Sequence, residues 1–124
     1  MAFHLGDLYA LAGDRGQAIA AYQQALASSA AANPAYIQAF IAFLSQDRAA
    51  LLKARETLAT TNPGPWQKGD VAVVDELIKY FGQPYEAVFG AMSCVDKTVS
   101  TSASQSQGYC QALLKKYAAL YKSH

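Results

Sequence analysis

The chain has 124 residues, of which 52% are hydrophobic and 15% are charged, so it is long enough and apolar enough to bury the core of one compact domain. Ten Lys and Arg residues against nine Asp and Glu residues leave a formal charge of +1, which gives no net field to attract nucleic acid or an anionic membrane. Two cysteines are too few for a fold built on disulfides, and the apolar content excludes a disordered chain.

Residues 1–33 predict the first pair of helices. Apolar residues at helical spacing mark the first helix, Gly13-Asp14 ends it, and a stripe of small and large residues marks the second. The pattern is Leu5-Gly6-x-x-Tyr9, Gly13-Asp14 and Ala18-x-x-x-Tyr22-x-x-Ala25-Leu26. Gly6 leaves room for close approach of the partner helix. The pattern resembles the tetratricopeptide repeat, a helix-turn-helix unit of about 34 residues.

The stretch between Arg15 and Asp47 contains no charged residue and was weighed as a membrane span. It is mostly alanine interrupted by glutamine, asparagine and proline, whereas a bilayer helix needs roughly 20 strongly apolar residues. Residues 1–7 lack the basic start and the long apolar segment of a signal peptide. We therefore expect no membrane span, and we expect a fragment of a longer protein, because the first helix is already under way at the first residue.

A second unit at residues 34–63 follows at nearly the same period. Asp47-Arg48 repeats Asp14-Arg15, and the apolar spacing predicts helices over 35–46 and 48–60. Residues 62–69 are rich in turn formers and predict a loop. A third hairpin is expected at 69–95, capped by Asp70, with a turn at Gly82-Gln83-Pro84 and Pro84 at the first position of its second helix. An unrelated helical pair is the alternative for this third unit.

The C-terminal part divides into a loop at 96–106, which is rich in Ser, Thr and Gln, and a capping helix at 107–122. The resemblance to the repeat is clear in residues 3–27 and degenerate in 35–95. It implies one all-α domain over residues 1–124, an α-solenoid of about three antiparallel hairpins and about seven helices in total. The last helix would cover the apolar flank of the third unit.

Cys94 and Cys110 lie on either side of the Ser/Thr-rich loop. We expect a disulfide that ties the capping helix to the third hairpin, and two buried free thiols are the alternative. A disulfide would favour an oxidising compartment such as a bacterial periplasm, and free thiols would favour the cytoplasm.

The sequence contains no recognised catalytic or metal-binding pattern. The two histidines, His4 and His124, lie at the chain ends without partners at catalytic or metal-ligand spacing. Asp75-Glu76 is an adjacent acid pair, but neighbouring residues on a helix point in different directions, so the two carboxylates do not share a catalytic site. We predict no enzyme activity, no metal site, no cofactor and no nucleic-acid partner.

The resemblance implies a protein or peptide partner, because such repeats use the inner faces of their first helices as a concave surface. The inner-face residues carried over from the repeat are Phe3, Asp7, Leu11, Tyr36, Phe40, Phe43, Glu76, Lys79 and Tyr80. This set predicts an apolar, aromatic groove for a partner helix or extended segment, with self-association as a further mode. The alternative is a structural spacer or dimerisation domain in which the aromatic residues are only core.

Overall fold

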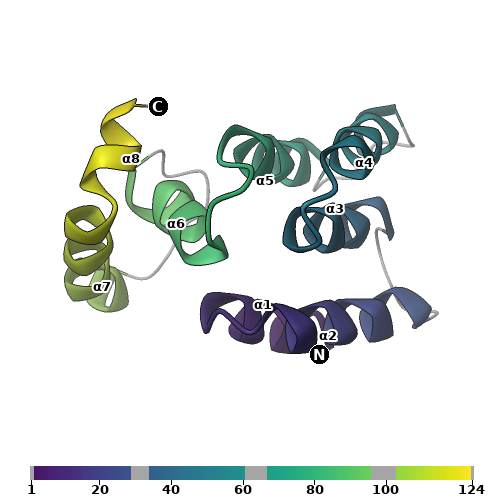
Figure 1. The fold of residues 1–124 in the computed structure, drawn as a ribbon, viewed down its shortest axis with the longest axis horizontal. Helices are drawn as coiled ribbons and strands as arrows, with labels where there is room; N and C mark the ends of the chain where they lie inside the picture. The colour runs from purple at the N-terminus through teal and green to yellow at the C-terminus, as the bar shows by residue number, and fades with distance from the viewer. Residues whose placement is uncertain (1, 29–33, 61–66, 96–102, 124) are drawn as a thin grey trace.

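The computed structural model describes residues 2–28, 34–60, 67–95 and 103–123, and every regular element in these ranges is a helix (Figure 1). The all-α prediction is therefore confirmed. In chain order the elements are α1 (Ala2–Leu11), α2 (Arg15–Ala27), α3 (Pro34–Leu44), α4 (Arg48–Thr60), α5 (Gln67–Lys79), α6 (Tyr85–Gly90), the π-helix η1 (Ala91–Val95), α7 (Ala103–Lys116) and α8 (Ala118–Ser123). Within these ranges, no helix combines the length and the apolar character that crossing a membrane requires.

The turns of the first two hairpins are built in the same way. Gly13 and Gln46 have positive φ angles of 84° and 58°, so a left-handed residue ends both α1 and α3. The backbone N–H of the next residue, Asp14 or Asp47, donates to a carbonyl five residues back at 2.9 Å. The same aspartate caps the following helix, because its side chain accepts a backbone N–H three residues on at 3.1 Å. The predicted turns at Gly13 and Asp47 are thus present.

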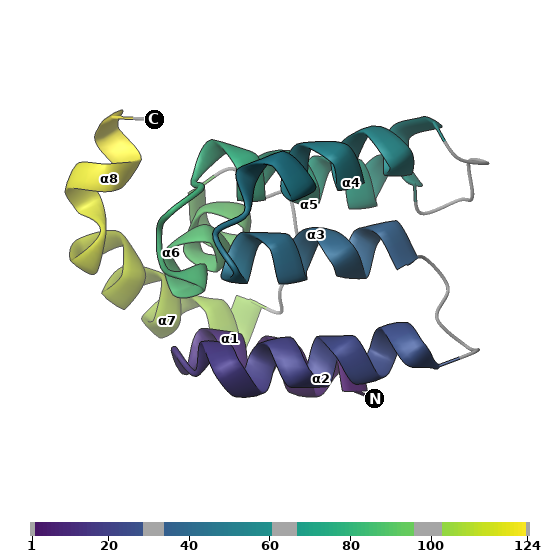
Figure 2. The same cartoon turned by 45° about the vertical axis from the view of Figure 1, so that its right-hand side comes forward.

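The first four helices stack in layers. α1 packs on α2 and α3 on α4, while α2 also lies against α3 and α4 against α5. Figure 2 shows α2, α3 and α4 side by side at successive levels. The approach of α1 to α2 depends on Gly6, where a methyl group would lie 2.7 Å from a ring carbon of Tyr22. Gly6 therefore provides the space that the sequence pattern predicts.

The core is centred on buried aromatic rings from three helices. Tyr22 of α2 is fully buried, and its ring centroid lies 5.4 Å from that of Phe40 in α3. The Tyr85 ring, at the start of α6, lies 5.9 Å from Phe40 and 6.4 Å from Phe43 in edge-on orientation, a favourable geometry for aromatic pairs. Aliphatic side chains extend the core to α4, α5 and α6: Leu51, Leu58, Val74, Leu77 and Val88.

The third hairpin differs from its prediction in three respects. α5 begins at Gln67, so Asp70 lies in its first turn and does not cap it. Pro84 occupies the N-cap of α6 instead of the first helical position. α6 packs on α1 and α7, whereas α5 contacts η1, the π-helix that follows α6. The cause is Tyr85, whose ring belongs to the core formed by α3, so α6 turns toward α1 and α3 and does not run along α5.

The C-terminal helices dock on α6 and η1 (Figure 1). Cys94 of η1 and Cys110 of α7 form a disulfide with Cα atoms 5.5 Å apart, which confirms the predicted pairing. α7 begins at Ala103, before the predicted start at 107, and the helix is interrupted at Tyr117, so the capping segment is two helices. Residues 96–102 of the predicted loop lie outside the described residues.

Two tyrosines and one leucine complete the docking. Leu113 is the buried residue among the described side chains of α7, and Gly90 leaves room for it and for Tyr121 of α8. The Tyr121 hydroxyl donates to the carbonyl oxygen of Ala87 at 2.7 Å. The Tyr117 hydroxyl donates to Glu86 Oε1 at 3.0 Å. The capping segment is thus attached by a few specific contacts on one small face.

Candidate functional site

Part of the inner face predicted as a partner-binding groove is closed by the chain itself. Phe40 and Phe43 are only 2% and 3% exposed, because Tyr85 of α6 packs against both rings. The structure corrects the prediction for these two residues: they belong to the core and offer almost no surface to a partner. The physical reason is the start of α6, which places the Tyr85 ring against α3.

Of the predicted site residues in α5 and directly after it, Tyr80 is covered by another part of the chain. Tyr80 is 1% exposed, and the ring of Tyr121 from α8 lies 6.1 Å from its ring centroid to centroid. Part of the predicted surface is therefore filled by the segment after Gln107, and Tyr80 is a core residue. Lys79 is exposed with its ammonium 5.3 Å from the centroid of the Tyr80 ring, and Glu76 is half-buried.

The predicted residues of α1 and the start of α3 lie together but have structural roles. The Tyr22 hydroxyl donates to the carboxylate of Asp7. Burial, with the Asp7 charge beside it, raises the pKa of Tyr22 far above its usual range, so the hydroxyl stays protonated and keeps donating. Tyr36 is half-buried, and its ring lies edge-on to Phe40 at 5.1 Å. The side chain of Phe3 lies outside the described residues.

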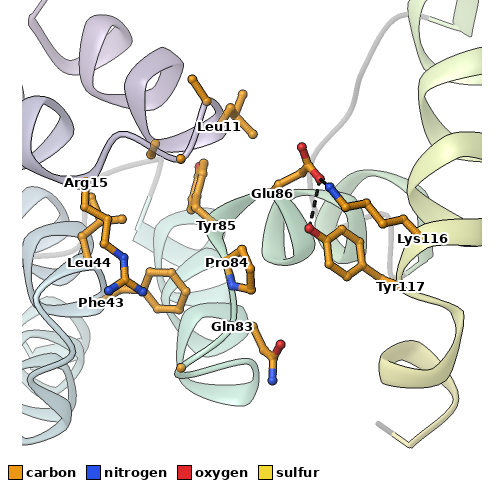
Figure 3. A pocket seen from close by; sticks show the side chains of 14 residues that line it. Leu11, Arg15, Phe43, Leu44, Gln83, Pro84, Tyr85, Glu86, Lys116 and Tyr117 are labelled. Atoms are coloured by element: carbon orange, nitrogen blue, oxygen red, sulfur yellow. Dashed lines mark hydrogen bonds and ion pairs between the residues drawn. The ribbon is translucent and has the colours of Figure 1, made fainter.

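A pocket of about 390 Å³ opens where the ends of four helical segments meet. Its lining comes from the α1–α2 turn, the end of α3, the turn before α6 and the end of α7. Figure 3 shows Pro84 and Tyr85 between two walls, with Leu11 above them. Leu11 and Phe43 are the two predicted site residues that line it. The pocket is therefore a different site from the predicted groove, although it shares two residues with it.

One wall of the pocket is a closed polar network. Lys116 Nζ lies 2.9 Å from Glu86 Oε1, and the Tyr117 hydroxyl donates to the same oxygen (Figure 3). The lysine and the hydroxyl both favour the ionised carboxylate, so they lower the pKa of Glu86 against the opposing effect of its burial. The charge of Glu86 is thus compensated within the wall.

The opposite wall carries Arg15, the first residue of α2. Its side chain is exposed and lies beside the Phe43 ring in Figure 3. With its amide oxygen turned toward Arg15, Gln46 accepts hydrogen bonds from both terminal guanidinium nitrogens, at 2.8 and 2.7 Å. This partner is neutral, so it orients the guanidinium without cancelling its charge.

A second groove of about 470 Å³ lies between α2, α3 and α4. Its lining includes Leu26 and Ile41 with polar side chains such as Gln38 and Lys53. No cluster of three or more His, Cys, Asp or Glu that could hold a metal ion occurs in the described part of the chain. The chemistry offered by both depressions is therefore noncovalent: apolar surface, hydrogen bonds and charge.

Most of the pocket wall could not be predicted from the sequence. Arg15 stands out only as part of the Asp-Arg repeat at the hairpin turns, and that recurrence is the signal that could have identified it. Lys116 and Glu86 carry no comparable signal in the sequence. Their pairing across 30 residues depends on the docking of α7 against α6, which no local pattern encodes.

Comparison with known proteins adds no assignment to this geometry. No protein-family model matches the chain, and no curated protein and no solved structure matches it. The site is therefore interpreted from its own residues.

Proposed function

We propose that this chain is a protein-interaction module built from helix-turn-helix units of the tetratricopeptide type, and that it holds a partner segment in the pocket between Arg15 and Lys116. The single observation that carries the proposal is the lining of this pocket. Aromatic and aliphatic side chains form its floor, and charged groups stand on two opposite walls. Such a combination suits an extended peptide, because the floor provides affinity and the walls fix orientation.

The first four helices support the repeat interpretation. Two consecutive hairpins, α1–α2 and α3–α4, share the same left-handed turn and the same aspartate cap. Gly6 and Tyr22 make the close helix contact expected of the pattern in residues 3–27. The position of Tyr85 argues for a site at the turns, because its ring covers Phe40 and Phe43 on the inner face of α3.

Selection of peptides from a random displayed library on the purified chain tests the proposal. The pocket is blocked with Ala12→Trp, and Ala50→Trp is the matched control, because both alanines are exposed and Ala50 lines the second groove. We expect selected peptides to bind Ala12→Trp at least about 10-fold more weakly than wild type, and to bind Ala50→Trp normally, as measured by fluorescence anisotropy. Peptides that lose binding only in Ala50→Trp would contradict the assigned site.

Self-association is a second candidate function, favoured by one observation. Leu5 and Leu8 lie on one face of α1 and are 43% and 64% exposed. Exposed leucines three residues apart can form an apolar contact between two copies. Sedimentation velocity on wild type and Leu8→Lys distinguishes the two functions. Dimers that the lysine abolishes would support self-association, whereas a monomer at all concentrations would remove it.

A further inference from the structure

The charges around the pocket do not balance. Three charged side chains line it: Glu86, Lys116 and Arg15. Glu86 and Lys116 form an ion pair at 2.9 Å, and Tyr117 adds a second donor to the same carboxylate oxygen. These two charges therefore cancel each other, and Arg15 is left as the uncompensated charge of the pocket.

The carboxylate nearest to Arg15 in sequence is committed elsewhere. Asp14 caps α2: its Oδ1 accepts the backbone N–H of Gln17 at 3.1 Å, and its Oδ2 accepts the Gln17 side-chain amide at 2.7 Å. The guanidinium of Arg15 has the neutral Gln46 amide as its partner. Arg15 is thus held in place, with its charge available to a ligand.

A second arginine stands at the equivalent position of the next hairpin. Asp47 caps α4 through the backbone N–H of Ala50, and Arg48 follows it as the first residue of the helix. The guanidinium carbon of Arg48 lies 5.7 Å from the centroid of the Phe81 ring. Phe81 in turn lies 6.3 Å from Phe43, which lines the pocket beside Arg15. Arg15 therefore lies beside one of two neighbouring rings and Arg48 beside the other.

We infer that the partner segment is acidic: an extended peptide with a Glu or Asp side chain for Arg15 next to an apolar residue for Leu11 and Pro84 on the pocket floor. This inference rests on the proposed function and specifies its partner. An uncompensated, pre-oriented guanidinium binds a carboxylate in bidentate geometry, and the apolar floor distinguishes a peptide from a small free anion. Arg48 strengthens the attraction from outside the pocket.

Two labelled heptapeptides test the inference by fluorescence anisotropy. The probe has the sequence Gly-Leu-Glu-Phe-Glu-Leu-Gly, and its control has glutamine in place of both glutamates. We expect the glutamate peptide to bind at least about 10-fold more tightly than the control, and its affinity to fall when NaCl is raised from about 0.05 M to 0.5 M. Arg15→Gln should weaken binding about 10-fold and Arg48→Gln about 3-fold, while Lys53→Gln in the second groove leaves it unchanged. Circular dichroism melts verify that all three variants are folded.

The outcomes separate this inference from the proposed function. Equal binding of both peptides, lost in Ala12→Trp and unaffected by Arg15→Gln, would overturn the acidic partner and retain the pocket as a peptide site. Binding that survives in Ala12→Trp, or no binding of either peptide to wild type when library peptides also fail, would overturn both. If free succinate displaces the glutamate peptide as effectively as the unlabelled peptide does, the site binds small anions and the inference is wrong.

Discussion

The first two hairpins and the C-terminal helices are held in place by different means. In α1 to α4, buried rings and aliphatic side chains from each helix interlock, and Tyr22, Leu51 and Leu58 are fully buried. In α7 and α8, Leu113 is the buried residue among those described, and the other contacts of these helices include a disulfide, two tyrosine hydroxyls, an ion pair and the half-exposed rings of Tyr109 and Tyr121. One region is stabilised by burial and the other by a small number of specific links.

This difference means that one substitution has different consequences in the two regions. A buried ring in the hairpins contacts several helices, so its removal weakens packing throughout the core. A link in the C-terminal region joins one pair of groups, so its loss releases a local segment. The following predictions test this contrast, from the largest expected effect to the smallest.

Removing the central ring of the core gives the largest expected loss. Phe40→Ala deletes contacts with Tyr22, Tyr36 and Tyr85 and should lower the free energy of unfolding by about 3–5 kcal/mol. Tyr109→Ala in α7 removes a ring that is 40% exposed and contacts Phe89, and should cost less than about 1.5 kcal/mol. Urea unfolding measures both values. Similar losses in the two variants would refute the contrast between the regions.

Reduction of the Cys94–Cys110 disulfide comes next. The bond spans 16 residues in sequence, and the chain-entropy model assigns such a loop about 3 kcal/mol. Hydrogen exchange should accelerate in α7 and α8 after dithiothreitol treatment, while exchange in α1 to α4 stays unchanged. The Cys94→Ser and Cys110→Ser double variant should respond to dithiothreitol in neither region. Faster exchange in α1 to α4 after reduction would contradict this prediction, because it would mean that the disulfide also stabilises the first two hairpins.

Alanine substitutions at two glycines measure how tightly the helices pack in the two regions. In Gly6→Ala the new methyl lies within 2.9 Å of three atoms of the buried Tyr22 ring, and the variant should lose about 2–3 kcal/mol. In Gly90→Ala the methyl meets the hydroxyl of Tyr121 and lies 3.1 Å from a methyl carbon of Leu113. α7 and α8 pack on one face and can shift outward, at the expense of the hydrogen bond from Tyr121 to Ala87, so the loss should be about 1 kcal/mol. Gly108→Ala meets no atom within 4 Å and should stabilise α7 slightly. Equal losses at Gly6 and Gly90 would contradict the ranking.

The smallest effect concerns pH. Lys116 lowers the pKa of Glu86 in the folded chain, so the ionised carboxylate contributes stability above its unfolded pKa of about 4.3. That contribution is lost as the pH falls toward the lower folded-state pKa. Melting temperatures of wild type and Glu86→Gln should therefore differ at pH 7 and converge near pH 3. A constant difference between the two proteins would mean that the ion pair does not contribute.

The sequence predicted local features well and the position of α6 poorly. The bounds of α4 and the turns at Gly13 and Asp47 follow from residue types at short range, whereas the disulfide prediction depends on the last helix docking beside the third hairpin. The helical period also identified the apolar face of α3 correctly, but the same stripe is expected for a groove and for a core. Whether Phe40 faces a partner or Tyr85 is decided by where α6 packs. The pocket shares this difficulty, since its walls lie on segments far apart in sequence.

Gln46 links the two hairpins at an energetic cost that Gly13 does not carry. A non-glycine residue in the left-handed region costs roughly 1–2 kcal/mol, and Gln46 has a φ of 58°. Its side chain accepts hydrogen bonds from Arg15, which directly follows the turn of the first hairpin, so the two turns are connected. Contacts between neighbouring helical hairpins determine how cooperatively the two unfold. Gln46→Gly would relax its own turn and at the same time let the two hairpins open more independently.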